Sequence, residues 1–278
     1  MEYQYKNIKV NYEVVGNGKP VIILHGFKCE LNLMKCCLEP VFLEKSGYKR
    51  FYIDLPGMGK SGNELDYASS DGILEVLTGL ISNLVQEEFL VIGQSFGGYL
   101  ARGILTRFAD NINGMMLLCP VIIPQRDRRT LPSEVMKFED TVFLNQLSEA
   151  DRNEFCEFAI VANAETYKRY CEEVLKGIRH ANDRFVNKLD NSYSFTFDVD
   201  NIIKNIKFDK PVLFICGRQD NCVGFEDAWK LMPDYPRATF SVIDTAGHNL
   251  QIEQPELFHE LVCNWLVRVE KFASTVRV

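Results

Sequence analysis

The sequence lacks a long apolar segment and a basic start followed by an apolar stretch. Its first fifteen residues, MEYQYKNIKVNYEVV, are polar and alternating, so they do not resemble a secretory signal. The longest strongly apolar run, 115–123, is interrupted by Pro120 and is far too short to span a bilayer. We therefore expect a cytoplasmic protein that neither crosses nor binds membranes.

An excess of positive charge and a metal-binding cysteine pattern are also missing. The chain has 31 Lys and Arg against 38 Asp and Glu, a formal net charge of −7, which disfavours binding to nucleic-acid phosphates. Its nine cysteines are odd in number and include no C-x-x-C, so nothing predicts a metal site. Cys119 and Cys216 lie inside apolar runs, where a small buried side chain is expected.

Continuous apolar runs are what the chain does contain. With 278 residues and 46% hydrophobic composition, it can fold around one large core. Strands covered on both faces, as in a parallel sheet, have continuous rather than alternating hydrophobicity. Such runs occur at 21–24, 51–53, 89–92, 115–118, 212–215 and 240–243. The first fifteen residues alternate instead, which predicts antiparallel strands at the sheet edge.

Helical patterns separate these runs. Apolar residues at three- and four-residue steps predict a helix capped by Ser69 or Ser70 and reaching 84, and another over 98–108. A last helix is predicted from Pro255 to about Phe272. Alternating strands and helices predict an α/β fold, a mostly parallel central sheet flanked by helices.

One long segment breaks the alternation. Residues 124–206 contain no core-strand run, and helix starts are predicted at 148–151 and 163–165. We therefore expect a core domain of residues 1–123 and 207–278, with 124–206 as a helical insertion over the sheet. The segment is no richer in aromatic residues than the whole chain. We expect four of its phenylalanines, at 138, 143, 155 and 158, to form its own core, with a position facing a pocket as the alternative.

A candidate nucleophile follows one of the buried strands. Residues 93–97 read Gly-Gln-Ser-Phe-Gly, which fits G-x-S-x-G, and they lie between the strand at 89–92 and a helix. That strand–turn–helix setting exposes the serine hydroxyl above the sheet on a sharp turn. We therefore predict that Ser95 is the catalytic nucleophile.

A serine nucleophile needs a general base, and the chain has four histidines. His248 lies in a loop directly after the last predicted strand, so it reaches the same edge of the sheet as Ser95. His25 directly follows the first buried strand, whereas His180 and His259 fall in helical segments where solvent exposure is expected. His248 is the predicted base.

The base in turn needs a carboxylate to orient it. Asp220 directly follows the strand at 212–215 and reaches this same edge. Asp227 is predicted to be helical, Asp244 belongs to a strand end, and Cys119 and Pro120 end the 115–118 strand without a carboxylate. Asp220 is the predicted acid, and the chain order Ser, Asp, His suits this architecture.

Together these segments resemble the α/β-hydrolase superfamily, and its capped, esterase-like serine hydrolases, along nearly the whole chain. Residues 21–27 (VIILHGF) look like the family's oxyanion loop, and 54–61 (DLPGMGKS) resemble its D-x-P-G-x-G-x-S loop. The resemblance implies that the backbone N–H groups of Phe27 and Phe96 form the oxyanion hole. It also implies structural roles for His25 and for residues 54–61, and a cap role for residues 124–206.

The leading functional hypothesis is hydrolysis of a small carboxylic ester, thioester or lactone through an acyl-enzyme, without cofactor or metal. Carbon–carbon hydrolysis of ring-cleavage products is an alternative. Members of that group resemble one another in a Gly- and Pro-rich loop after His-Gly, where this chain has Phe27-Lys28-Cys29. They also tend to have an aromatic residue directly after the base, where this chain has Asn249. A ligand receptor that keeps the triad is a third possibility. The expected partner is a small-molecule substrate, and the chain could be a monomer or a homodimer.

Overall fold

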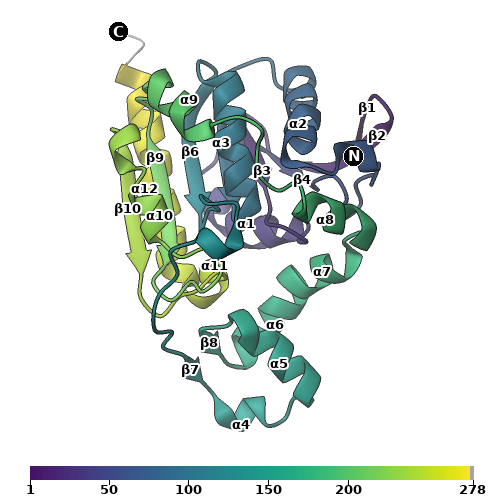
Figure 1. Cartoon of the computed structure of the whole chain (residues 1–278). Helices are drawn as coiled ribbons and strands as arrows, with labels where there is room; N and C mark the ends of the chain where they lie inside the picture. The colour runs from purple at the N-terminus through teal and green to yellow at the C-terminus, as the bar shows by residue number, and fades with distance from the viewer. Residues whose placement is uncertain (276–278) are drawn as a thin grey trace.

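The computed structural model describes residues 1–275, and a central eight-stranded sheet forms its core (Figure 1). The strand order is β1-β2-β4-β3-β5-β6-β9-β10. The strands are β1 Glu2–Tyr5, β2 Ile8–Val15, β3 Lys19–Leu24, β4 Tyr48–Ile53, β5 Phe89–Gln94, β6 Ile112–Leu118, β9 Val212–Gly217 and β10 Ala238–Ile243.

Only the first two strands run antiparallel to their neighbours. β1 pairs with β2 and β2 with β4 in antiparallel fashion, while every pairing from β4 to β10 is parallel. Every residue of β5 is buried, as continuous hydrophobicity requires of a strand covered on both faces. The predicted mostly parallel sheet with an alternating, antiparallel edge is confirmed.

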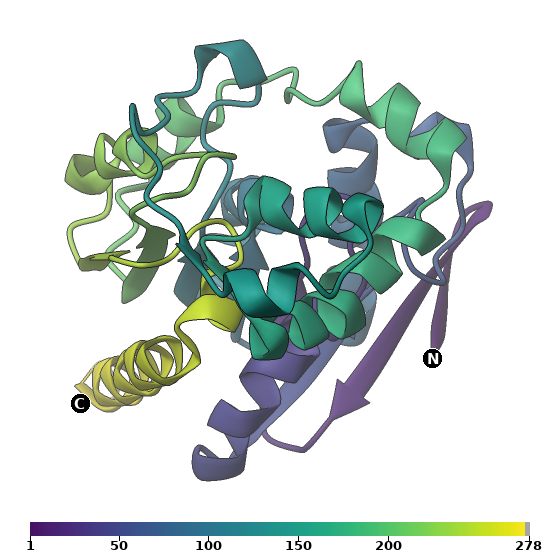
Figure 2. The same ribbon diagram turned by 90° about the horizontal axis from the view of Figure 1, so that it is seen from below.

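Helices cover both faces of the sheet. α2 and α3 pack together on one face and α1 and α12 on the other (Figures 1 and 2). The helices are α1 Asn32–Glu44, α2 Ser70–Leu84, α3 Phe96–Phe108, α4 Thr141–Leu144, α5 Glu149–Phe158, α6 Ala164–Arg169, α7 Lys176–His180, α8 Asp183–Asp190, α9 Val199–Ile206, α10 Glu226–Trp229, α11 Leu250–Glu253 and α12 Pro255–Thr275. Ser69 caps α2 through its hydroxyl, which accepts a hydrogen bond from the N–H of Gly72.

The segment from 124 to 206 has two parts. In Figure 1, α4 to α7 and the short strands β7 (Phe138–Glu139) and β8 (Val161–Ala162) lie beyond the carboxyl ends of the parallel strands, and Figure 2 views the molecule from that side. α9 instead packs on α3, at the side of the sheet. There the guanidinium of the fully buried Arg102 pairs with Asp200.

The strand order reverses between β3 and β5. From β3 the chain crosses outward to β4, and it then returns past β3 to β5 and continues to β6 on the other side. In open α/β sheets, ligands bind at the carboxyl ends of strands where the order reverses in this way. The loops after β3 and β5 are therefore the places to look for a site. Within residues 1–275, no helix has the length and apolar character needed to cross a membrane.

Candidate active site

Ser95 occupies a strained turn between β5 and α3. Its backbone angles are φ 52° and ψ −115°, a conformation that costs a non-glycine residue about 1–3 kcal/mol. The turn is held by the Ser95 N–H, which donates to the Leu118 carbonyl at 2.9 Å, and by the Ser95 carbonyl, which accepts from Val121 at 3.0 Å. The glycines on either side of Ser95 are required by close backbone packing. A Cβ on Gly93 would lie only 2.3 Å from the Gly97 carbonyl oxygen, which is too close for any other residue type.

The predicted triad residues lie within hydrogen-bond distance of one another. His248 Nε2 is 2.9 Å from Ser95 Oγ, and His248 Nδ1 is 2.9 Å from Asp220 Oδ2. The other oxygen of Asp220 accepts hydrogen bonds from the N–H groups of Cys222 at 2.8 Å and Val223 at 3.0 Å. Asp220 is fully buried, so these contacts hold its carboxylate, and through it the imidazole ring, in one orientation.

The electrostatics suit a charged acid beside a basic imidazole. Burial acts to raise the pKa of Asp220, but His248 and the two backbone N–H donors outweigh it, so the net pKa lies below its ordinary value. Burial acts to lower the pKa of His248, but the Cys222 thiol and Asp220 raise it well above its ordinary value. The carboxylate therefore stays ionised, and the imidazole is a stronger base than a free histidine.

Cys222 is a neighbour of the imidazole that sequence reasoning missed. Burial acts to raise the pKa of its thiol, yet His248 lowers it to below the ordinary value. Its place in the sequence could have identified it, because Cys222 lies two residues after Asp220 at the predicted functional edge of the sheet. Negative charge on this thiol stabilises the imidazolium, so Cys222 is expected to raise the proton affinity of the base.

We expect the pH profile of hydrolysis to reflect this contact. His248 accepts a proton only when neutral, so kcat/KM should fall as the pH drops through its pKa, with a midpoint above 6.5. Cys222→Ala should move that midpoint to lower pH. Cys29→Ala is the matched control, because burial raises the pKa of the Cys29 thiol to about 12 and leaves it uncharged. A midpoint at or below 6.5, or equal shifts in both variants, would contradict the assignment.

The backbone N–H groups of Phe27 and Phe96 lie on the two segments that meet at Ser95. Phe96 opens α3, so its N–H has no acceptor within the helix, and no described residue accepts from the N–H of Phe27. The loop after β3 approaches the nucleophile closely, since a Cβ on Gly26 would lie 3.3 Å from the Cβ of Ser95. Both donors are thus available beside Ser95.

The other histidines are placed differently. His25 Nδ1 donates to the Gly26 carbonyl at 2.7 Å, and its Nε2 accepts from the Leu55 N–H at 3.0 Å. Burial lowers the pKa of His25, so a neutral ring with both nitrogens engaged ties two loops together. His180, at the end of α7, pairs with Glu30, which lies just before α1. His259 lies on α12, and neither histidine lines the cavity at Ser95.

Residues 54–61 form the tight structural loop that the resemblance implied. Asp54 Oδ1 accepts from the Leu31 N–H at 2.8 Å, and Oδ2 accepts from the Asn11 amide at 2.8 Å and the Lys60 N–H at 2.9 Å. The Ser61 hydroxyl donates to the Asp54 carbonyl at 2.6 Å. With both carboxylate oxygens occupied, Asp54 joins strand β2 to the loops after β3 and β4.

A cavity of about 300 Å³ opens above the nucleophile. Ser95, His248, Gly26 and Phe27 contribute to its wall, and residues between 121 and 193 close it from the other side. Phe158 lines this cavity, which is the alternative to the expected place in the core of the insertion. Phe155 follows that expectation, since its ring contacts Tyr167 and Tyr170. Helical periodicity could not separate the two positions, because both lie on α5.

Glu253 is a second residue that sequence reasoning missed. Its Oε2 accepts from the Gly247 N–H at 2.6 Å, next to the base, and its Oε1 accepts from the Ile160 N–H at 2.6 Å. Burial raises the pKa of this carboxyl group. The side chain therefore joins the loop that carries His248 to the strand that precedes α6.

Two clusters of potential metal ligands occur among residues 1–275. One is formed by Cys119, Asp220 and His248, but burial raises the pKa of the Cys119 thiol well above its ordinary value and both oxygens of Asp220 are occupied. The other is formed by Glu44, His259 and Cys263, between α1 and α12. The nucleophile site therefore fits proton transfer better than metal binding.

Known proteins resemble the chain over nearly its whole length. A family model described as "alpha/beta hydrolase fold" matches residues 19–255. A 2-hydroxy-6-oxononadienedioate/2-hydroxy-6-oxononatrienedioate hydrolase of Paraburkholderia phymatum is 25% identical, over 93% of this chain and 91% of the relative. The monoacylglycerol lipase ABHD6 of Bos taurus is 20% identical, over 91% and 77%. The crystal structure of an alpha/beta superfamily hydrolase from Oenococcus oeni PSU-1 superposes with a TM-score of 0.86 at 29% identity, over 97% of this chain and 99% of that one.

Proposed function

This chain belongs to the α/β-hydrolase fold family, and we propose that it hydrolyses a small carboxylic ester, or a related thioester or lactone, through an acyl-enzyme on Ser95. The observation that carries the proposal is the hydrogen-bonded series Ser95, His248 and Asp220, which opens into a cavity of about 300 Å³. The same proposal assigns the segment 124–206, apart from α9 at the side of the sheet, the role of a cap over that cavity. Residues 1–123 and 207–278 are the proposed core, and the last three of them lie outside the described residues.

In the first half of the reaction, Ser95 Oγ attacks the acyl carbon while His248 Nε2 takes its proton. Negative charge develops on the acyl oxygen, which the N–H groups of Phe27 and Phe96 stabilise, each by about 3 kcal/mol. Asp220 stabilises the imidazolium. The tetrahedral intermediate then collapses, the bond to the alcohol breaks, and His248 returns its proton to the leaving oxygen.

In the second half, His248 takes a proton from water, and the hydroxide oxygen attacks the acyl-enzyme carbonyl. The new tetrahedral intermediate collapses, the bond to Ser95 Oγ breaks, and His248 gives its proton back to the serine. The products are a carboxylic acid and an alcohol, and the enzyme returns to its starting state. No group outside the chain and water is needed.

A series of p-nitrophenyl esters with increasing acyl length tests the proposal. A cavity of about 300 Å³ lies at the small end of ligand pockets, so kcat/KM should peak at short acyl chains and fall for long ones. A peak at the longest chains would contradict the size of the cavity. Absence of turnover with every ester, thioester and lactone would reject the reaction class.

Carbon–carbon bond hydrolysis is the second candidate, because the names of two similar relatives favour it. The hydrolases from Paraburkholderia phymatum and Burkholderia vietnamiensis, 25% and 26% identical, are named for a nonadienedioate. The loop Phe27-Lys28-Cys29 and Asn249 weigh against this candidate, as stated above. Incubation with 2-hydroxy-6-oxononadienedioate separates the two: cleavage of this compound without any ester hydrolysis would favour carbon–carbon hydrolysis.

A further inference from the structure

The cavity at Ser95 has a charge opposite to that of the whole chain. Three cationic residues line it, namely Lys28, Arg126 and Arg129, and no Asp or Glu of residues 1–275 does. The chain as a whole has more acidic than basic residues, 38 against 31. Asp220 lies behind the imidazole of His248 and is fully buried. The walls of the cavity therefore favour a negatively charged group.

Arg129 is the best-placed of these cations. Its guanidinium donates to three backbone carbonyls, those of Ile123 at 2.9 Å, Pro124 at 3.2 Å and Cys222 at 3.0 Å. These bonds fix the head group, and no described carboxylate neutralises it. A guanidinium has five N–H donors, so a ligand can still reach it.

Lys28 is a second cation without a carboxylate partner among the described residues. It follows the predicted oxyanion residue Phe27, and its ammonium lies 5.9 Å from the centre of that ring. Its φ of 63° is unusual for a lysine and turns the chain beside the nucleophile.

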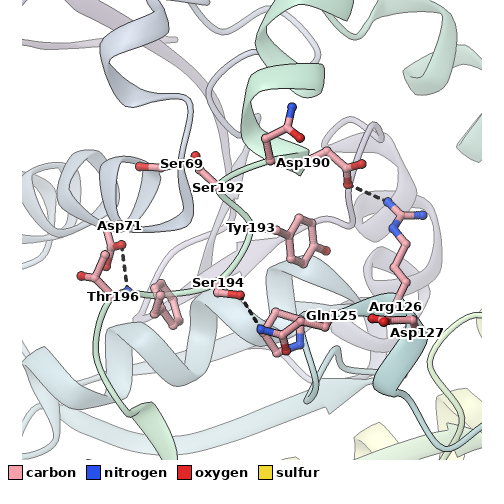
Figure 3. Close-up of a pocket in the computed structure, with 13 residues that line it drawn as sticks. Ser69, Asp71, Gln125, Arg126, Asp127, Asp190, Ser192, Tyr193, Ser194 and Thr196 are labelled. Carbon is pink, nitrogen blue, oxygen red and sulfur yellow. Dashed lines mark hydrogen bonds and ion pairs between the residues drawn. The ribbon is translucent and has the colours of Figure 1, made fainter.

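Arg126 differs, because Asp190 accepts a hydrogen bond from its guanidinium at 2.9 Å. Figure 3 shows this pair at the edge of a polar groove of about 910 Å³, close to Tyr193. Arg126 and Tyr193 line both the groove and the cavity, so the two spaces adjoin. With Arg126 largely neutralised, Arg129 and Lys28 supply the uncompensated charge.

We infer that the substrate carries a carboxylate besides its scissile acyl group, and that Arg129 and Lys28 bind this carboxylate. The inference rests on the proposed hydrolase function and narrows its substrate class to anionic acyl compounds. A neutral ester in the cavity would leave the partly buried guanidinium of Arg129 without a counter-charge, which is unfavourable. A carboxylate matches the planar fork of a guanidinium and gains charge-assisted hydrogen bonds.

Matched pairs of substrates test the inference and locate the carboxylate. For the acyl side, mono-p-nitrophenyl glutarate is compared with p-nitrophenyl valerate; for the alcohol side, butyryl glycolate is compared with propyl butyrate. In one of the two pairs, the wild type should prefer the anion by about 10- to 100-fold in kcat/KM, the range expected of hydrogen bonds to a charged group. The preference should appear mainly in KM, since binding of a remote group is equal in ground and transition states.

Variants assign the preference to residues. Arg129→Gln and Lys28→Gln should each reduce the ratio of anionic to neutral kcat/KM, and Arg129→Lys should retain part of it. Arg128→Gln is the matched control, because Arg128 is exposed, adjacent in sequence and outside the cavity. Because each ratio is measured within one variant, partial unfolding cancels. The inference would be overturned if the wild type did not prefer the anionic substrate in either pair. It would also be overturned if the ratio of anionic to neutral kcat/KM were unchanged in both Gln variants.

A binding measurement separates failure of the inference from failure of the proposed function. In Ser95→Ala, glutarate should raise the melting temperature, whereas uncharged 1,5-pentanediol should not. The rise should be lost in Ser95→Ala/Arg129→Gln and kept in Ser95→Ala/Arg128→Gln. Stabilisation by glutarate without hydrolysis of any ester would reject the reaction but keep the anion site. Ester hydrolysis without stabilisation by glutarate and without a preference for anionic substrates would keep the proposed reaction but reject the anion site.

Discussion

Replacing Ser95 by alanine is expected to lower kcat for a p-nitrophenyl ester by about 10⁶-fold, as for other serine nucleophiles with a base. This loss corresponds to about 8 kcal/mol of transition-state stabilisation. The physical reason is that the Ser95 hydroxyl, the proposed nucleophile, lies 2.9 Å from His248 Nε2. The residual rate would come from water activated by His248 beside the oxyanion donors.

The fold should not suffer from this change. Alanine keeps the Cβ and the φ of 52°, and the backbone bonds of residue 95 to Leu118 and Val121 do not involve the hydroxyl. We expect the free energy of unfolding to change by less than about 1 kcal/mol, because His248 lines the cavity and water there can replace the lost hydroxyl as the partner of Nε2. Ser194→Ala, in the adjoining groove, is the control and should retain full activity. Turnover within tenfold of wild type in Ser95→Ala would refute the nucleophile.

Asp220→Asn is expected to lower kcat by about 10⁴-fold, while the protein stays folded. An asparagine can still accept the N–H bonds of Cys222 and Val223 through its oxygen. Its NH₂ group would then face His248 Nδ1 and donate to it, which forces the proton of the imidazole onto Nε2. In that tautomer the imidazole cannot accept the proton of Ser95.

The double variant Ser95→Ala/Asp220→Asn distinguishes this role from simple loss of structure. Because the two residues act in one proton transfer, the double variant should be no slower than Ser95→Ala alone. If the double variant lost activity by the product of the two single-variant factors, or if Asp220→Asn had a much lower melting temperature, Asp220 would support the fold rather than the base.

Much of the fold follows from patterns that are local in the sequence. The buried parallel strands could be predicted because covered strands require continuous apolar runs, and α2 could be predicted because Ser69 precedes a helical repeat of apolar residues. The helix predicted from residue 98 begins two residues earlier, at Phe96, because the turn at Ser95 leads directly into α3. The packing of α9 on α3 depends on contacts far apart in the chain, which periodicity does not encode.

The same division applies to the site. Ser95, Asp220 and His248 could be placed together because each follows a strand whose carboxyl end reaches one edge of the sheet. Glu253 and Arg129 could not be found in this way. Glu253 sits in a short helix, and Arg129 in an irregular segment, and only the three-dimensional path of the chain brings them to Gly247 and Cys222.

The central claim, that Ser95 forms an acyl-enzyme, is tested most directly by mass spectrometry of the protein during turnover. The enzyme is mixed with excess p-nitrophenyl butyrate, quenched in acid within the first turnovers and digested. We predict one butyryl group per chain, located on the peptide that contains Ser95 and absent from Ser95→Ala. Rapid turnover with the butyryl group on another residue, or with no adduct in a quench faster than one turnover, would contradict the account.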